Sequence, residues 1–576
     1  MRSLSDLGPS EYRVVDYLVE HLEASGVDYI FGVDGANIED VFDAAYDRDG
    51  LTAILAKHEF SAAAMADGYA RAGHGLGVVA ATSGGGSLNL IAGLGESLTS
   101  RVPVLALVGQ PPTGMDGRGS FQDTSGRAGT LDAHALFSAV SVYCRRVTRP
   151  TDIGAALREA SAAARTGGPA VLLLPKDIQQ AVIDRVNPVV TTPDSIPADP
   201  TMIVDALRRA LGPVTIIAGE QVARDDARRE LEQLRAALRA WVAVVPDAKD
   251  VSGSPGLGHS SWLGVTGVMG HPRVADAVSR SAVCLLVGTR LSVTARAGLD
   301  EALGRIQTVS IGSAQPYIGC AHTDSSNLKT SLAMLTRSLT GSARPHGVRV
   351  LEPLPADSLR PPVHDGPGLR YRDALAILDE MLPDGADVVV DAGNTGAAAI
   401  HQLPVRRDGR FVVALGMGGM GYSFGAGIGM CLARAKSVAR QRTVIIAGDG
   451  SFYMHGMELH TAVQYQLPLT VLLFNNNAHA MCVTREQLFY GDRYSYNRFT
   501  PARLGAGLAA MFPGLPATDA ADLSTLRRAL ADALHRPGPT VVSIECSADE
   551  IPPFAPFLDT IESDQKENTE HVAARA

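Results

Sequence analysis

The sequence predicts an α/β fold made of three doubly wound parallel sheets. Short apolar runs typical of buried strands alternate with helical patterns along the 576 residues, and this alternation is typical of parallel sheets covered by helices. Two Pro-rich breaks, 187–200 and 344–367, interrupt it. The length also fits about three or four domains. The expected parts, in chain order, are an N-terminal domain (1–186), a central domain (200–343), a C-terminal domain (368–557) and a flexible charged tail (558–576).

The first domain is expected to open with a helix over 11–25, because its apolar residues recur at helical spacing. Apolar runs bounded by turn residues then predict strands, and an Ala-rich stretch predicts a second helix. These elements are, in chain order, strands 29–33 and 51–55, helix 61–72, and strands 76–82, 103–108 and 168–175.

The other two domains repeat this alternation of strands and helices. The central domain is expected to contain helix 201–211 and strands 214–218, 283–287 and 308–311. The C-terminal domain is expected to contain helix 370–382 and strands 388–391, 443–447 and 469–474.

Composition and charge exclude several classes of function. The net charge is −10 and the pI about 5.8, so we expect neither a nucleic-acid surface nor a polybasic membrane patch. The six Cys are scattered without a CxxC pair, and the first residues carry no apolar segment typical of a signal peptide. No uncharged apolar run reaches the length of about 18 residues that a membrane helix needs. We therefore expect a cytoplasmic protein that holds small ligands by local groups.

Polar residues follow two apolar runs of the C-terminal domain. Gly448-Asp449-Gly450 comes after the first run, and Asn475-Asn476-Asn477 comes after the second. Both groups lie just past the carboxyl end of a strand, where open parallel sheets bind ligands. The Asp carboxylate and the Asn amide are hard oxygen donors that suit Mg²⁺, and the glycines let the backbone approach a diphosphate. The alternative is an ordinary Gly turn and an Asn-rich loop.

This pattern resembles the diphosphate–Mg²⁺ motif of the thiamine diphosphate (ThDP) enzyme superfamily. The resemblance covers nearly the full chain and implies a pyrimidine-binding, a middle and a diphosphate-binding domain. It implies Mg²⁺ ligands at Asp449, Asn476 and Ala478. The residues that it assigns to cofactor binding are Gly84, Gly85, Asn394, Gly418, Met420, Gly448, Asp449, Gly450, Ser451, Asn476, Ala478, His479 and Ala480.

Glu59 is the residue that we expect to carry catalysis. It lies between a strand end and an Ala-rich helix, and burial disfavours the charged form of a carboxylate. In the ThDP enzymes that this segment resembles, such a Glu hydrogen-bonds the pyrimidine ring nitrogen of the cofactor and thereby promotes its activation. The alternative is a carboxylate that only stabilises a helix N-terminus through the helix dipole.

The Gly-rich segment 415–422 allows two interpretations. It contains GxGxxG at Gly416, Gly418 and Gly421, which is the fingerprint of dinucleotide binding. That interpretation requires an acidic residue about 20 positions later, and residues 436–441 contain none. The resemblance to ThDP enzymes implies instead that Met420 supports the bent cofactor, and the alternative is that Met420 fills the core.

Four further residues have less specific assignments. Asp34 stands in a turn where benzaldehyde-lyase-like ThDP enzymes carry a catalytic His, so it is either a proton relay or an Asx-turn residue. Phe121 and Gln122 resemble an acetolactate synthase pair that faces the cofactor. Gln122 is expected to hydrogen-bond the substrate, unless it lies in a surface loop. Asn394 is expected to contact the diphosphate, unless it only caps a helix.

The segment from Asn476 to Ser495 aligns without gaps to acetolactate synthases. This similarity implies that Met481 and Cys482 line the substrate pocket, whereas Arg485 replaces the Trp that selects a small 2-keto acid acceptor there. An Arg offers a fixed positive charge and two parallel donors. We therefore expect a larger or anionic acceptor, unless Arg485 points to solvent.

The central domain indicates a second nucleotide-type cofactor less clearly. The turns at 264–267 and 287–290 resemble the FAD-contacting turns of acetolactate synthases. Residues 310–312 (Ser-Ile-Gly) stand where those enzymes have Ile-Asp. FAD is therefore a possible cofactor that lacks one expected contact.

The resemblance implies a ThDP- and Mg²⁺-dependent carboligase of the acetolactate synthase type. It would decarboxylate a 2-keto acid, with pyruvate as the expected donor, and transfer the acyl carbanion equivalent to a carbonyl acceptor. The departures favour an unusual or anionic acceptor from specialised metabolism, for example a keto-sugar. Because the family places Glu59 of one chain beside Asp449 of another, a homodimer is the minimum and a homotetramer is expected. The alternatives are an ordinary acetolactate synthase, a benzaldehyde lyase or 2-keto acid decarboxylase, a flavin oxidase, and an inactive ThDP-binding homologue.

Overall fold

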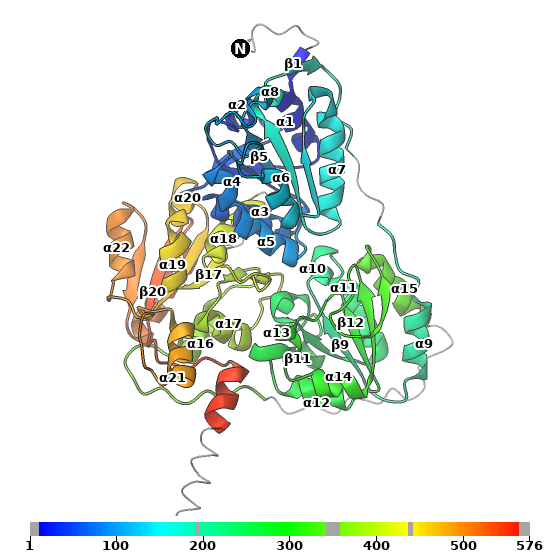
Figure 1. Ribbon diagram of the computed structural model, residues 1–576. Coiled ribbons are helices and arrows are strands. Elements are labelled where there is room, and N and C mark those ends of the chain that lie inside the picture. The colour runs from blue at the N-terminus through cyan, green and yellow to red at the C-terminus, as the bar shows by residue number, and fades with distance from the viewer. Residues whose placement is uncertain (1–10, 191–194, 341–356, 436–441, 564–576) are drawn as a thin grey trace, which may run out of the picture. The chain divides into compact units, whose positions relative to one another are not determined.

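The computed structural model describes residues 11–190, 195–340, 357–435 and 442–563 (Figure 1). These residues fold into two compact units. Among the described residues, the first unit contains those up to 190, 414–435 and 453–469, and the second contains those within 195–413, 442–452 and 470–563.

The first unit contains a six-stranded parallel sheet of the order β3-β2-β4-β5-β7-β6. Its strands are β2 (Tyr29–Val33), β3 (Thr52–Leu55), β4 (Gly77–Ala81), β5 (Val104–Gln110), β6 (Tyr143–Arg146) and β7 (Pro169–Pro175). All residues of β4, β5 and β7 are buried, as expected for strands covered by helices on both faces. A separate antiparallel pair joins β1 (Glu11–Arg13) to β8 (Val182–Asp184).

Two helices of the first unit were expected from the sequence, over 11–25 and 61–72, and both form with shifted ends. The helices of this unit are α1 (Val14–Ala24), α2 (Glu39–Tyr46), α3 (Glu59–Tyr69), α4 (Gly85–Asn89), α5 (Ile91–Thr99), α6 (Ala133–Ala139), α7 (Ile153–Arg165), α8 (Lys176–Gln179), α18 (Tyr422–Arg434) and α20 (Leu459–Gln464). The helix expected over 11–25 starts at Val14, because residues 11–13 pair with β8. The helix expected over 61–72 starts two residues earlier and continues as a π-helical turn over Ala70–His74.

The second unit contains two six-stranded parallel sheets. The central sheet has the order β11-β10-β9-β12-β13-β14, and the third sheet has the order β16-β15-β17-β18-β20-β19. The central strands are β9 (Val214–Ala218), β10 (Trp241–Val244), β11 (Trp262–Val265), β12 (Val283–Val287), β13 (Gln307–Gly312) and β14 (Ala321–Asp324). The strands of the third sheet are β15 (Asp387–Val390), β16 (Phe411–Val413), β17 (Thr443–Gly448), β18 (Leu469–Asn475), β19 (Ala517–Ala520) and β20 (Thr540–Glu545).

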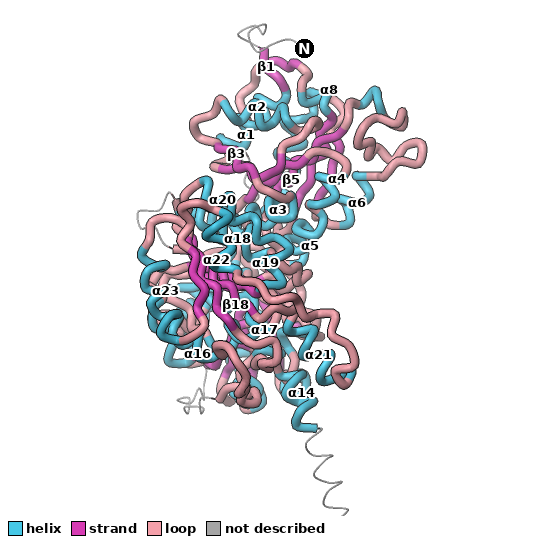
Figure 2. Tube along the Cα trace, turned by 90° about the vertical axis from the view of Figure 1, so that its left-hand side faces the viewer, coloured by secondary structure: helices cyan, strands magenta, loops and turns pink. Residues whose placement is uncertain are grey.

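Helices cover the two sheets of the second unit, and Figure 2 shows α16, α17 and α23 around the third sheet. They are α9 (Thr201–Arg209), α10 (Gln221–Arg224), α11 (Arg228–Leu238), α12 (Arg273–Ser279), α13 (Val293–Arg296), α14 (Asp300–Arg305), α15 (Leu328–Thr340), α16 (Tyr371–Met381), α17 (Asn394–Gln402), α21 (Ala480–Tyr490), α22 (Leu504–Met511) and α23 (Leu523–His535). Helix α19 (Asp449–His455) starts in the second unit and ends in the first.

The strand orders show where each sheet can bind a ligand. Numbered along the chain within each sheet, the first and third sheets share the order 2-1-3-4-6-5, and the central sheet has the dinucleotide-fold order 3-2-1-4-5-6. Ligands of such sheets bind at the carboxyl ends of strands where the order reverses. The reversals lie between β2 and β4, between β9 and β12, and between β15 and β17.

The fold predicted from the sequence, three doubly wound parallel sheets, is confirmed. The domain boundaries stay predictions. Most of the break expected over 344–367 lies outside the described residues, and so does the tail beyond 563, whereas residues 555–563 are helical. No helix within the described ranges is long and apolar enough to cross a membrane.

Candidate functional site

Asp449 lies where the third sheet reverses its strand order. Helix α19 begins at Asp449 directly after β17, so the expected Gly-Asp-Gly turn is the first turn of a helix. One carboxylate oxygen, Oδ2, accepts the backbone N–H of Ala478 at 3.2 Å. The other, Oδ1, is buried and has no hydrogen-bond partner among the described residues. Burial raises the pKa of Asp449 to about 7 against the effect of backbone donors. The ionised carboxylate therefore needs a cation.

Asn476 follows β18, the strand next to β17. Its amide Nδ2 lies 3.4 Å from the hydroxyl of Tyr371. Its Oδ1 is buried and lacks a partner within the described part of the chain. The neighbouring amides brace the loop, because Asn475 Nδ2 donates to the carbonyl of Ala502 at 2.8 Å and Asn477 Oδ1 accepts the Ala502 N–H at 2.9 Å. Asp449 and Asn476 thus offer two buried oxygens at adjacent strand ends that no described residue hydrogen-bonds.

These oxygens fit the predicted Mg²⁺ site. No group of three or more His, Cys, Asp or Glu side chains among the described residues could hold a metal ion. A site at this edge must therefore combine the carboxylate, the amide oxygen and a backbone carbonyl. Mg²⁺ suits such a set, because it takes few protein oxygens and completes its shell with phosphate and water. The carbonyl of Ala478 remains a predicted ligand, and the N–H of this residue already binds Asp449.

The predicted diphosphate contacts of the second unit gather around the same strand ends. A Cβ placed on Gly448 would meet no atom within 4 Å, so the backbone there faces open space. Ser451 donates its hydroxyl back to the carbonyl of Gly448 at 2.9 Å. Gly450 and Ala480 are buried, and His479 is half-buried.

Asn394 is the first residue of α17, at the end of β15. Its Nδ2 donates to the Thr484 hydroxyl at 3.3 Å, and its Oδ1 is buried without a partner among the described residues. The cap position of this helix is Gly393, which provides no side-chain hydrogen bond. Helix capping therefore does not explain Asn394, which stays a candidate for cofactor binding.

Helix α21 carries the three predicted substrate residues of the second unit. Met481 is half-buried, Cys482 is exposed and Arg485 is exposed. The Arg485 guanidinium lies 5.4 Å from the ring centre of Phe489 and forms no ion pair with any acid of the described chain. An exposed guanidinium without a carboxylate partner is available to an anionic ligand.

Glu59 is the first residue of α3 in the first unit and is 8% exposed. Its Oε2 accepts the amide of Asn89 at 2.9 Å. A Cβ on Gly86 would lie 2.9 Å from Glu59 Oε1, so this glycine makes room for the carboxylate. Glu59 also lies at a helix N-terminus. This position agrees with the alternative interpretation as well, in which the carboxylate only stabilises the helix through its dipole.

The turn after β4 gathers the other predicted residues of the first unit. The Ser83 hydroxyl donates to Gln122 Oε1 at 3.2 Å, and Gln122 has a left-handed backbone, with φ of 59°. Gly84 has φ of 62°, and a Cβ there would lie 2.7 Å from Gln122 Cγ. A Cβ on Gly85 would meet nothing within 4 Å. Gln122 is therefore held against the strand end rather than placed in a free surface loop.

Asp34 and Phe121 lie at the outer part of this turn region. Asp34 is exposed, and its Oδ1 accepts the N–H of the adjacent Gly35 at 2.7 Å. An Asx turn would bond the residue two positions on, so this contact is a different one. Phe121 is 78% exposed. The relay role of Asp34 and the substrate role of Phe121 stay predictions.

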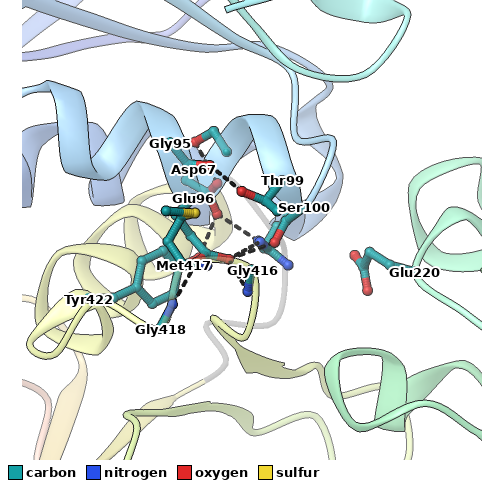
Figure 3. Close-up of polar contacts among 12 residues, drawn as sticks. Asp67, Gly95, Glu96, Thr99, Ser100, Glu220, Gly416, Met417, Gly418 and Tyr422 are labelled. Atoms are coloured by element: carbon teal, nitrogen blue, oxygen red, sulfur yellow. Dashed lines mark hydrogen bonds and ion pairs between the residues drawn. The ribbon is translucent and has the colours of Figure 1, made fainter. Parts of the chain in front are cut away.

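The Gly-rich loop of the first unit binds a carboxylate of the protein itself. The N–H groups of Gly416, Met417 and Gly418 point at Glu96 on α5 (Figure 3). These donors would hold the pyrophosphate in a dinucleotide site, so the dinucleotide interpretation does not fit. Residues 436–441, where the acidic residue was sought, lie outside the described ranges. Met420 is half-buried.

The central sheet differs from the other two at the point where its strand order reverses. There the side chain of Gln221 lies at the carboxyl ends of the strands. Its Oε1 accepts the N–H of Ser313 at 2.7 Å, and its Nε2 donates to the carbonyl of Ser325 at 2.9 Å and to Asp225 at 3.0 Å. A Cβ on Gly288, in a turn that resembles a flavin contact, would lie 2.8 Å from Gln221 Cβ.

The remaining glycines of the flavin-like turns also face atoms of the protein. A Cβ on Gly264 would lie 2.4 Å from the His271 ring, and one on Gly267 would lie 2.0 Å from the carbonyl of Thr294. A Cβ on Gly312 would lie 2.9 Å from Gln221 Oε1. These glycines therefore allow close approach of the protein's own atoms, on the side where a side chain would project.

The sequence did not reveal three contacts of the site. Asn89 binds Glu59, Tyr371 meets Asn476, and Glu96 holds the Gly-rich loop. Only Glu96 left a signal, as the one charged residue of its helix, where an unpaired buried charge would be costly.

Comparisons with known proteins agree with this geometry. Three models of one family match the chain: the N-terminal thiamine pyrophosphate (TPP) binding domain of thiamine pyrophosphate enzymes at 12–129, their central domain at 201–326 and their C-terminal TPP binding domain at 391–544. Together these models span more than half of the chain.

Relatives match over most of their length. A probable acetolactate synthase large subunit of Methanocaldococcus jannaschii is 29% identical over 83% of this chain and 82% of its own. The acetolactate synthase isozyme 2 large subunit of Escherichia coli is 28% identical over 94% of this chain and 96% of its own. The fold also resembles a proposed thiamin diphosphate-dependent enzyme isolated from Mycobacterium smegmatis, with a TM-score of 0.77, 22% identity, and coverage of 93% of this chain and 100% of that one.

Proposed function

The chain belongs to the thiamine pyrophosphate enzyme family, and from this membership we propose that it is a Mg²⁺-dependent carboligase. It decarboxylates a 2-keto acid and transfers the resulting acyl carbanion equivalent to a carbonyl acceptor. One observation carries this proposal. The buried Asp449 Oδ1 and Asn476 Oδ1 lack partners among the described residues at adjacent strand ends, where a cation and a diphosphate would satisfy them.

The residues of the chain supply binding, orientation and proton transfer. When bound, ThDP supplies the electron sink for the decarboxylation. Asp449, Asn476 and the carbonyl of Ala478 would hold Mg²⁺ and, through it, the diphosphate. Glu59, whose carboxylate is buried and oriented by the Asn89 amide, would hydrogen-bond the pyrimidine ring nitrogen. Gln122, fixed by the Ser83 hydroxyl, would donate its amide N–H to a substrate oxygen.

The acceptor distinguishes two versions of this function. The relatives named acetolactate synthase favour pyruvate as donor and a second small 2-keto acid as acceptor. The exposed Arg485, which has no carboxylate partner among the described residues, favours a larger, anionic acceptor, such as a phosphorylated or nucleotide-linked keto-sugar. We propose the second version because the charge stands on the helix that carries the predicted pocket residues Met481 and Cys482.

Product analysis tests the proposed function directly. The purified protein, supplied with ThDP and Mg²⁺, is incubated with pyruvate alone and with a panel of aldehyde, ketone and keto-sugar acceptors, and the products are identified by mass spectrometry. A coupled product with loss of CO₂ is expected from an anionic keto-sugar. Acetolactate as the dominant product in every mixture would favour the ordinary synthase, and acetaldehyde alone would indicate a simple decarboxylase.

Replacing Arg485 should change the acceptor and leave the donor unaffected. We expect Arg485→Ala to lower kcat/KM for an anionic acceptor by about 10- to 100-fold, because a charged hydrogen bond contributes roughly 1.5–3 kcal/mol. CO₂ release from pyruvate alone should stay at the wild-type rate. The matched control is Arg493→Ala, another exposed Arg shortly after α21. Unchanged acceptor preference and affinity in Arg485→Ala would show that Arg485 only faces solvent.

We infer that the central domain binds no FAD, because Gln221 and the packed glycines already fill its flavin-like turns. Purified protein should show no flavin absorbance, and added FAD should not shift its melting temperature. Gln221→Ala should lower that temperature, since it removes three hydrogen bonds and leaves the carbonyl of the buried Ser325 without this donor, at a cost of about 1–3 kcal/mol. Gln233→Ala, at an exposed position of α11 in the same domain, should have little effect. Flavin that copurifies with the wild type would contradict this inference.

A further inference from the structure

The Gly-rich loop takes its conformation from one buried carboxylate. The N–H groups of Gly416, Met417 and Gly418 lie 3.1, 2.6 and 3.3 Å from the carboxylate oxygens of Glu96, as the dashed lines in Figure 3 show. These three residues belong to no helix or strand, and the Met417 side chain is 65% exposed. With no regular structure to support it, this part of the loop depends on Glu96.

Glu96 is itself fixed by a hydroxyl at the end of its own helix and by an Arg in the turn that follows α3. It is 2% exposed, and the Ser100 hydroxyl donates to its Oε1 at 2.6 Å. The Arg71 guanidinium lies 3.9 Å from the same oxygen and pairs with Asp67 of α3 at 2.6 Å. Such partners offset the cost of burying a carboxylate. This chain of contacts fixes Glu96 relative to α3, the helix that begins at Glu59.

The same loop lies against the start of α3. A Cβ on Gly419 would lie 3.3 Å from the ring of Phe60, the residue after Glu59. Helix α18, which follows the loop, packs closely on α3, because a Cβ on Gly425 or Gly429 would lie 2.4 Å or 2.0 Å from carbonyl oxygens of α3. A shift of the loop would therefore change the distance between Glu59 and the loop residues Gly418 and Met420.

We propose that Glu96 is a positioning residue that holds the backbone of 416–418, and with it Gly418 and Met420, in the geometry that catalysis requires. This role rests on the proposed function, which assigns those two residues to the cofactor. Three donors on one carboxylate bind more strongly than they would on a neutral group, because charge-assisted hydrogen bonds are about twice as strong. Removal of the charge should therefore loosen the loop while the shape of the side chain is kept.

The test compares Glu96→Gln with the wild-type protein in three measurements. Hydrogen–deuterium exchange should become faster in the peptide that contains 415–421 and stay unchanged in the sheets. The affinity for ThDP in the presence of Mg²⁺ should fall on the order of 10-fold, as expected for a weakened charged hydrogen bond. The kcat should fall on the same scale, with the KM of the 2-keto acid within about twofold. The control is Asp40→Asn, a buried carboxylate of α2 that binds Gln180 instead, and it should leave all three measurements unchanged.

Two results would overturn the proposal. One is that Glu96→Gln keeps both the wild-type rate of hydrogen–deuterium exchange in the loop and the wild-type affinity for ThDP. The other is a lower melting temperature with wild-type kcat and ThDP affinity in the folded fraction, which is the result of a purely structural role. If Glu96→Gln does not fold, Gly416→Ala replaces it, because the new Cβ would lie 2.9 Å from Glu96 Oε1 and would displace the loop with the charge unchanged. Gly416→Ala should then give faster loop exchange and weaker ThDP binding, and the wild-type values of both would overturn the proposal.

These measurements separate the positioning role from the proposed function. If the wild-type protein couples no 2-keto acid to any acceptor, the proposed reaction fails. Loop exchange and ThDP affinity would still report whether Glu96 positions the loop.

Discussion

Asp449→Asn should abolish turnover and weaken the Mg²⁺-dependent binding of ThDP at least on the order of 100-fold. Residues that only hydrogen-bond a metal ligand already contribute about 10- to 100-fold to metal affinity, and a direct ligand should contribute more. The amide keeps the size of the side chain but removes the negative charge that would bind the cation. Titration of ThDP at several Mg²⁺ concentrations, followed by calorimetry or intrinsic fluorescence, measures this loss. Wild-type affinity in the variant would show that Asp449 does not hold the metal.

The stability of metal-free Asp449→Asn shows whether weaker ThDP binding comes from the lost cation ligand or from unfolding of the protein. The folded pKa of Asp449, about 7, lies above its ordinary value of 3.8. As the pH rises from about 4 to 7, the unfolded chain is already ionised while the folded carboxylate is not, so this group lowers the free energy of unfolding. At pH 8 metal-free Asp449→Asn should therefore be at least as stable as the wild type. Asp408→Asn, at an exposed left-handed turn position that Asn tolerates, should change neither stability nor ThDP binding.

Local patterns in the sequence were sufficient to predict the strands that lead to the site residues, and the ends of those strands. The apolar runs before Asp449 and Asn476 fixed two buried strands, and the sheet order then placed both residues at one edge. The strand-end rule depends only on chain direction within a parallel sheet, so it needs no knowledge of distant contacts. The same holds for Glu59, which begins a helix directly after a short loop from β3.

The contacts that orient these residues could not be predicted in the same way. Glu96 and Gly416 are separated by 320 positions, and only the packed fold brings them together. Gln221 closes the central sheet through residues of two later loops, which depends on the order of β9, β12 and β13. The turn glycines resembled a flavin site because glycine is needed wherever a backbone is approached closely, whether by a ligand or by the protein itself.

Glu59→Gln should lower kcat by about 100- to 10,000-fold, the range that general acid–base groups contribute, with little change in the affinity for ThDP. Gln can still accept the Asn89 amide, which lies 2.9 Å from the native carboxylate, but it cannot give or take a proton. The control is Glu39→Gln, at the first residue of α2 and exposed. If Glu59 only stabilises a helix N-terminus, both variants should lose about 0.3–1 kcal/mol of stability and keep their kcat.

Mixing two inactive variants tests whether the site is shared between chains. In a dimer that joins Glu59 of one chain to Asp449 of the other, a hybrid of Glu59→Gln and Asp449→Asn contains one site with both substitutions and one intact site. Random exchange of subunits should then restore about a quarter of the wild-type activity, because half of the dimers are hybrids and each has one intact site of two. A site formed within one chain predicts no recovery, since every site would carry one substitution. Absence of recovery after demonstrated subunit exchange would therefore overturn the shared-site dimer and leave the roles of Glu59 and Asp449 to their single variants.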